Sequence, residues 1–195
     1  VYDLDLSKLG REIVYDVDNR EKIRQPFDRI AYFVELTKDD GTKQNLYVSM
    51  DAFTDDLGKI GVPTAASGAF FQQNVANMNV YSNVDGIVTG MGLSGGNIEF
   101  WPDNYSGRNV TRVPNANDAF DFGDESQGRN DGHGSMQIHN HDAKQTLFAL
   151  NQWRGGNQAD LGIGNRSGGH DTDWTFARNA GSYKAKRLRI LVHLR

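Results

Sequence analysis

Two segments of this chain, residues 29–38 and 185–194, alternate apolar and polar side chains with a period of two. Successive side chains of a β-strand point to opposite faces of a sheet, so this period indicates strands with one buried face. The apolar members of the two segments are Ile30, Tyr32, Val34 and Leu36, and Leu188, Ile190, Val192 and Leu194. The fold therefore has to pack apolar sheet faces.

Turn signals recur along the chain, which holds 22 glycines, many of them between short apolar runs. This pattern favours an all-β fold. Further strands are expected at residues 12–18, 44–51, 75–81, 95–101, 133–141, 145–153 and 158–164, with short ones near 120–122 and 173–177, and one helical turn is expected at 53–57. The turn Asp39-Asp40-Gly41 predicts a hairpin of 29–38 with 44–51, and a second hairpin joins 133–141 to 145–153.

Roughly ten short strands at turn-rich spacing predict two packed antiparallel sheets. We expect a single domain over residues 1–195, an antiparallel β-sandwich of jelly-roll-like form. The last strand, 185–194, should pack near the hairpin that begins at residue 29.

The composition excludes several classes of function. A formal net charge of −4 argues against a nucleic-acid-binding protein. The absence of cysteine excludes disulfides, thiolate metal sites and cysteine nucleophiles. No apolar run approaches the roughly 18 residues of a membrane helix. The chain begins at Val1 without Met, and we interpret it as an excised domain or a processed chain.

Three tryptophans, Trp101, Trp153 and Trp174, lie among Asn, Asp, Gly and Arg rather than in apolar runs. An aromatic ring can cover the apolar C–H face of a sugar while polar neighbours bond its hydroxyls, although the same rings could plug the core at strand ends. The candidate sugar-binding residues are Trp101, Asn104, Tyr105, Asn140, Trp153, Arg154, Asn165, Arg166, Trp174 and Arg178.

Two other motifs suggest metal chemistry. His139 and His141 are two residues apart, which would direct both rings to one face of a strand, with His133, Asp142 or Asp171 as a third ligand. The competing interpretation is that the two histidines are ordinary polar surface residues, or hydrogen-bonded residues at a strand end. The acidic loop at 121–132 favours a structural calcium ion, or is simply solvated. The candidate calcium ligands are Asp121, Asp124, Glu125 and Asp131.

Motifs for catalysis are missing. The sequence contains no Gly-x-Ser-x-Gly elbow and no phosphate-binding loop, and nothing positions a general acid against a nucleophile. We therefore expect a domain without catalytic residues.

Several runs of the chain resemble a known family. They are Gly134–Asn140 (GSMQIHN), Gln145–Asn151 (QTLFALN), Asp160–Asn165 (DLGIGN), Asp173–Ala177 (DWTFA), Asp16–Arg20 (DVDNR) and Asn97–Pro102 (NIEFWP). They resemble a non-catalytic β-sandwich domain that accompanies bacterial sialate O-acetylesterase-type and other polysaccharide-degrading proteins. The resemblance covers most of the chain, and the hydrolase motifs of the companion enzyme are absent.

The resemblance implies a carbohydrate-binding module attached to a secreted, cell-surface or periplasmic bacterial enzyme. Its partners would be a polysaccharide and the linked catalytic domain. Arg154, Arg166 and Arg178, near the tryptophans, could pair with sulfate or carboxylate groups, which favours an acidic or sulfated marine galactan such as agar, porphyran or carrageenan.

Two other functions compete with this interpretation. One is a polysaccharide lyase or esterase that uses His139 or His141 as a base, and the other is a structural domain that only packs against a catalytic neighbour. Retention on insoluble polysaccharide separates a binding module from a structural domain, and a turnover assay identifies an enzyme.

Overall fold

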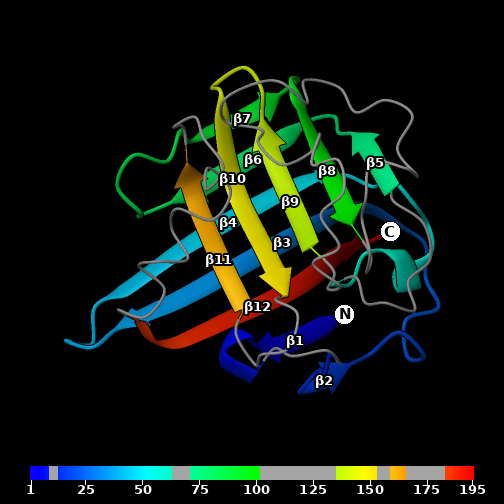
Figure 1. The fold of residues 1–195 in the computed structure, drawn as a ribbon. Coiled ribbons are helices and arrows are strands. Elements are labelled where there is room, and N and C mark those ends of the chain that lie inside the picture. The colour runs from blue at the N-terminus through cyan, green and yellow to red at the C-terminus, as the bar shows by residue number, and fades with distance from the viewer. Residues whose placement is uncertain (9–12, 63–70, 102–134, 153–158, 166–182) are drawn as a thin grey trace, which may run out of the picture.

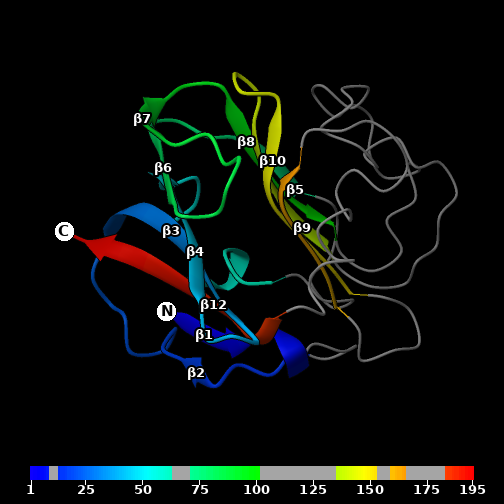
Figure 2. The same cartoon turned by 90° about the vertical axis from the view of Figure 1, so that its left-hand side faces the viewer.

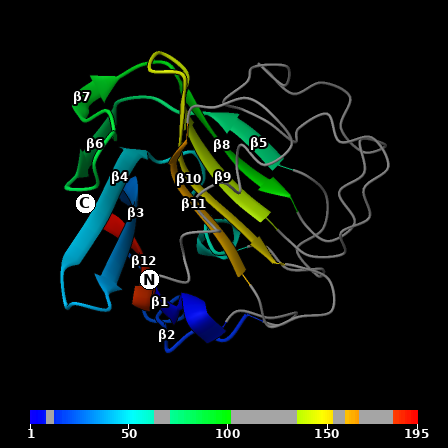
Figure 3. The same ribbon diagram turned by 60° about the vertical axis from the view of Figure 1, so that its left-hand side comes forward.

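The computed structural model describes residues 1–8, 13–62, 71–101, 135–152, 159–165 and 183–195 (Figure 1). These residues form an all-β fold in which two antiparallel sheets pack face to face, which confirms the predicted β-sandwich. Figures 2 and 3 show β12, β3 and β4 in one layer and β8, β9 and β10 in the other. Within the described residues the helices are single 3-10 turns, and none has the length or apolar character that crossing a membrane requires.

The larger sheet has seven strands in the described residues, in the order β2-β1-β12-β3-β4-β6-β7. Their bounds are β1 (Tyr2–Asp5), β2 (Val17–Asp18), β3 (Phe27–Lys38), β4 (Lys43–Asp51), β6 (Met78–Ser82), β7 (Gly90–Leu93) and β12 (Tyr183–Leu194). The long strands β12, β3 and β4 form its centre, and the N-terminal strand β1 pairs with the C-terminal strand β12.

The smaller sheet has five strands in the described residues, in the order β11-β10-β9-β8-β5. Their bounds are β5 (Phe71–Asn74), β8 (Gly96–Trp101), β9 (Ser135–Asn140), β10 (Gln145–Gln152) and β11 (Ala159–Asn165). The chain passes from one sheet to the other between β4 and β5, β5 and β6, β7 and β8, and β11 and β12. Strands that are close in sequence therefore often lie in different layers.

Both predicted hairpins are present. β3 pairs with β4 and β9 pairs with β10. β12 lies between β1 and β3, so the predicted closing strand does pack beside the first hairpin. Between His193 and Leu194 the register shifts because β3 has one residue more than β12, and Leu194, beyond this shift, is 40% exposed, whereas Leu188 and Ile190 are fully buried.

Three strands form where the sequence predicted none: β1, β5 and β7. The expected strand at 12–18 is reduced to Val17–Asp18, and the expected turn at 53–57 is replaced by a 3-10 turn at Leu57–Lys59. That turn begins after Asp56, whose carboxylate accepts a hydrogen bond from the Gly58 amide at 2.8 Å. The short strands expected near 120–122 and 173–177 lie outside the described residues.

One hydrophobic core fills the space between the sheets. The larger sheet contributes the alternating side chains of β3 and β12, and the smaller sheet contributes Ile98, Ile138 and Phe148. Each of these large side chains stabilises the fold by about 1.5–3 kcal/mol on burial. Alternate side chains of each central strand face this core, so the remaining side chains of these strands form the two outer faces of the sandwich.

Candidate functional site

Buried polar side chains occupy the outer face of the smaller sheet. Ile98 and Phe100 pack into the core, so Asn97 and Glu99 of the same strand face away from it. The register of β8, β9 and β10 places their neighbours beside them. The polar residues of this face that are at most 3% exposed are Asn97, Glu99, Gln137, His139 and Thr146.

His139 is hydrogen-bonded through both ring nitrogens. Its Nε2 lies 2.9 Å from Oε1 of Gln137, and its Nδ1 lies 3.0 Å from the hydroxyl of Thr146. An amide oxygen only accepts, so Nε2 carries the proton and Nδ1 accepts from the Thr146 hydroxyl. Burial lowers the pKa of His139 well below 6.5, with a smaller contribution from His141, so the ring is neutral near pH 7.

His141 continues the network beyond the end of β9. Its Nε2 lies 3.0 Å from Oδ1 of Asn97, and Nδ2 of Asn97 donates to Oε1 of Glu99 at 2.8 Å. The direction of the second bond fixes Oδ1 of Asn97 as an acceptor, so Nε2 of His141 is also the protonated nitrogen. The two imidazole centroids are 6.0 Å apart.

These contacts bear on the predicted metal pair. The two histidines do share a face of the sheet, but Nε2 of each ring donates a hydrogen bond to an amide oxygen. Asp142, one suggested third ligand, accepts from the Gly95 amide at 3.1 Å. Among the described residues no group of three potential metal ligands occurs. The other suggested ligands, His133 and Asp171, lie outside the described residues.

The predicted sugar-binding residues fall mostly outside the described residues: Asn104, Tyr105, Trp153, Arg154, Arg166, Trp174 and Arg178. The same holds for the predicted calcium ligands Asp121, Asp124, Glu125 and Asp131. The backbones of Trp101 and Asn165 end β8 and β11. Asn140 is 1% exposed, and its Oδ1 accepts from the Ala143 amide at 3.0 Å, so its side chain closes the β9–β10 turn.

The outer face of the larger sheet carries three aromatic rings in a row, which we call the aromatic strip: Phe33 on β3, Tyr47 on β4 and Tyr81 on β6. The register pairs Phe33 with Tyr47 and Tyr47 with Tyr81. Neighbouring ring centroids are 6.2 Å and 6.1 Å apart. Tyr81 is 45% exposed and the other two rings are partly exposed. The row runs across the strands that Figure 2 shows side by side.

Asparagines flank the strip on the same face. Asn45 lies two residues before Tyr47, and Asn79 lies two residues before Tyr81. Oδ1 of Asn79 accepts from the Gly92 amide at 2.9 Å, so its NH₂ group is directed away from that contact. Amide groups beside aromatic rings provide the donors and acceptors that hydroxyl-rich ligands require.

A charged cluster closes the β12 end of the strip. Arg189 pairs across the strands with Phe33, and its guanidinium lies 5.9 Å from that ring centroid. The same guanidinium contacts the carboxylates of Asp3 and Glu35. Arg187 in turn contacts Asp3 at 2.7 Å and Asp16 at 2.9 Å. Both guanidinium groups are therefore neutralised within the protein.

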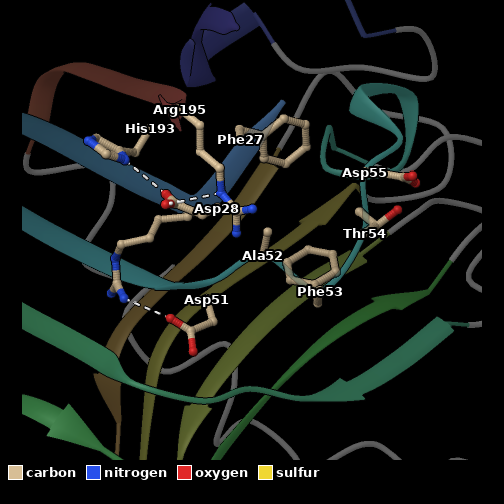
Figure 4. Close-up of a pocket in the computed structure, with 10 residues that line it drawn as sticks. Phe27, Asp28, Asp51, Ala52, Phe53, Thr54, Asp55, His193 and Arg195 are labelled. Carbon is tan, nitrogen blue, oxygen red and sulfur yellow. Dashed lines mark hydrogen bonds and ion pairs between the residues drawn. The ribbon is translucent and has the colours of Figure 1, made fainter. Parts of the chain in front are cut away.

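An open pocket of about 690 Å³ lies at one end of the sandwich, between the rings of Phe27 and Phe53 (Figure 4). Asp28 stands at its rim, 2.8 Å from Nδ1 of His193 and 3.4 Å from Nε of Arg195. The hydrogen bond from His193, aided by Arg195, holds the pKa of Asp28 below its usual value of 3.8.

A second carboxylate of this pocket, that of Asp51, is also paired. It accepts from Nη1 of Arg29 at 2.9 Å and from the amide of Asn77. The ring of Phe53 packs against Phe100 in the core, with centroids 6.1 Å apart. These contacts fix the walls of the pocket on the sandwich. The carboxylates of Asp28 and Asp51 are paired with cationic side chains of the protein.

The aromatic strip is not among the sugar-binding residues predicted from the sequence, which lie around the tryptophans after residue 100. A signal was present: the turn at Asp39-Asp40-Gly41 fixes the register that sets Phe33 opposite Tyr47. Comparisons with protein-family models, with curated proteins and with solved structures found no match for this chain.

Proposed function

We propose that this chain is a non-catalytic carbohydrate-binding module. The observation that carries the proposal is the aromatic strip, three partly exposed rings in one cross-strand row with asparagines beside them. A sugar presents an apolar C–H face and a rim of hydroxyls. Rings fixed on a rigid sheet cover the first, and neighbouring amides bond the second.

The geometry of His139 argues against its use as a catalytic base. A general base must reach the proton that it abstracts. His139 is fully buried and uses both ring nitrogens within the sheet, so its geometry suits a structural role. The competing proposal, a lyase or esterase that uses His139 or His141, predicts turnover of a polysaccharide, which a reducing-end and ester-release assay measures.

The biological setting follows from the same proposal. A module of this kind would hold a linked, secreted glycan-degrading enzyme of a bacterium near its polysaccharide, because tethering raises the effective concentration of substrate. The sequence-based prediction of an acidic or sulfated galactan such as agar, porphyran or carrageenan rests on Arg154, Arg166 and Arg178 alone, and not on the aromatic strip. These three arginines lie outside the described residues.

The proposal is tested by retention of the protein in gels that contain agarose, carrageenan, xylan or laminarin. Covering about 60 Å² of an exposed ring contributes about 1.5 kcal/mol, so Tyr81→Ala should weaken binding roughly tenfold. The double variant Tyr47→Ala with Tyr81→Ala should abolish retention. Val14→Ala is the control, because Val14 is 66% exposed and lies before β2, at the opposite edge of the sheet.

The melting temperature of each variant separates binding from folding. A cross-strand ring pair stabilises a sheet by about 0.2–1 kcal/mol, so the tyrosine variants should remain folded. If the unmodified protein is retained by no polysaccharide, the proposed function is wrong.

A further inference from the structure

We infer that the aromatic strip binds a single neutral glycan chain, which lies across the strands and has the twisted conformation of a chain in solution. The strip would not bind the flat surface of a crystalline polysaccharide. This inference rests on the proposed function and specifies its ligand. Three features of the strip carry it: the spacing of the rings, their tilt, and the charge beside them.

The spacing sets the direction of the ligand. Ring centroids follow one another at 6.2 Å and 6.1 Å along a line perpendicular to the strands, a little more than the roughly 4.8 Å between neighbouring strands. This step is comparable to the length of one sugar unit in an extended glycan chain. Each ring can therefore face one sugar, and three consecutive sugars can span the strip from Tyr81 to Phe33.

The tilt selects the shape of the ligand. The planes of Phe33 and Tyr47 differ by 60°, and those of Tyr47 and Tyr81 differ by 45°. Strands of a sheet rotate by about 20–25° from one to the next, which accounts for part of this difference. A crystalline polysaccharide is flat and would contact coplanar rings. Aromatic rings whose planes rotate from one strand to the next match a glycan chain whose sugar rings also rotate from one unit to the next.

The charge selects the chemistry of the ligand. Two guanidinium groups at the β12 end, Arg187 and Arg189, are shared by three carboxylates, Asp3, Asp16 and Glu35. Recruiting either guanidinium to a sulfate would break ion pairs that are already formed. Lys8 also contacts Asp16 at 3.7 Å, so the three carboxylates are matched by three cations within the protein. The strip therefore favours a chain segment without charge.

The flanking amides complete the site. Asn45 and Asn79 lie two residues before the two tyrosines, on the same face of their strands. Hydroxyls need both donors and acceptors, and a primary amide supplies both. A neutral polyhydroxylated chain satisfies these groups without an ionic partner.

The test is calorimetric titration with two- to six-unit oligosaccharides derived from agarose, cellulose, xylan and laminarin, beside sulfated oligosaccharides from carrageenan. Retention on crystalline cellulose and chitin is measured in parallel. We expect at least one neutral series to bind, with affinity rising to about three sugars and then levelling. We expect a Kd that changes less than about twofold when salt is raised, because screening weakens only ionic contacts.

Variants assign the binding to the strip. Tyr81→Ala should weaken the neutral series about tenfold and remove the gain from the third sugar, whereas Val14→Ala should change neither. Phe33→Leu, at the β12 end of the strip, should weaken the neutral series and remove the gain from the third sugar in the same way.

Three outcomes overturn the inference while leaving the proposed function standing. They are binding only to crystalline material, binding that requires sulfate and is lost at high salt, and binding that no strip variant affects. If no soluble or insoluble glycan binds at all, the proposed function is wrong and the inference is overturned with it.

Discussion

The imidazole of His139 shows how one residue fixes the polar face of the smaller sheet. Its two nitrogens join Gln137 and Thr146, so three strand positions are held by one ring in a single tautomer. A charged imidazolium cannot accept from the Thr146 hydroxyl, and burial adds a further cost. Sequence reasoning correctly placed His139 and His141 on one face, but the network depends on partners that only the strand register reveals.

His139 should make stability depend on pH. The pKa of His139 in the folded state is below the unfolded value of 6.5, so below pH 6.5 the unfolded chain binds a proton that the folded chain excludes. The free energy of unfolding should therefore fall as pH drops from 6.5 to 5, by at most about 1.4 kcal/mol per pH unit from this group.

Urea unfolding at several pH values measures this dependence. His139→Gln should flatten the slope between pH 5 and 6.5. His193→Gln, a change at a ring whose side chain is 71% exposed, is the control and should retain it. Equal slopes in the parent protein and in His139→Gln would contradict the assignment.

At the scale of secondary structure, alternation was a reliable guide only where strands are long. β3 and β12 were predicted from their period of two. β1, β5 and β7 each have four residues, which is too short for a period to stand out. β7 also contains Gly90 and Gly92, and glycine is depleted in strands.

The aromatic strip belongs to this scale because it exists only through strand pairing. Phe33 and Tyr47 meet through a local hairpin, which the turn sequence could have indicated. Tyr81 joins them because β6 pairs with β4 after the intervening strand, β5, has crossed to the other sheet. No pattern in the sequence announces that crossing.

The start of β8 depends on a close backbone approach. A Cβ at Gly96 would lie 2.7 Å from the His139 carbonyl oxygen and 3.0 Å from Cε of Met78. The methionine can move, but the carbonyl belongs to the β8–β9 ladder. Gly96→Ala should therefore destabilise the protein by about 1–3 kcal/mol in denaturant unfolding. A change below about 0.5 kcal/mol would mean that β8 and β9 separate more easily than the register indicates.

At the scale of the whole molecule, the sandwich assigns different roles to its two outer faces. The smaller sheet presents buried polar groups bonded to one another, and the larger sheet presents partly exposed rings. The sequence predicted the β-sandwich and its closing strand, because both follow from alternation and turns. It did not predict which face carries exposed rings, because that depends on how strands that are distant in sequence are ordered in each sheet.

The predicted structural calcium ion should stabilise the fold as a whole. The candidate ligands Asp121, Asp124, Glu125 and Asp131 lie outside the described residues, and the acidic loop that holds them is the only basis for the prediction. An ion bound only by the folded state raises the melting temperature. Calcium should raise the melting temperature, and a chelator or joint replacement of the four ligands by Asn or Gln should remove the increase. An unchanged melting temperature would count against the site.

We propose that a glycan binds on the outer face of the larger sheet. An NMR titration with a neutral oligosaccharide that binds the protein tests it most directly, because the ring and amide signals report the contacted face without any mutation. We expect chemical-shift changes at Phe33, Tyr47 and Tyr81 and at the side-chain amides of Asn45 and Asn79, with small changes at His139. Shifts confined to β8–β11, with the signals of the aromatic strip unmoved, would contradict it.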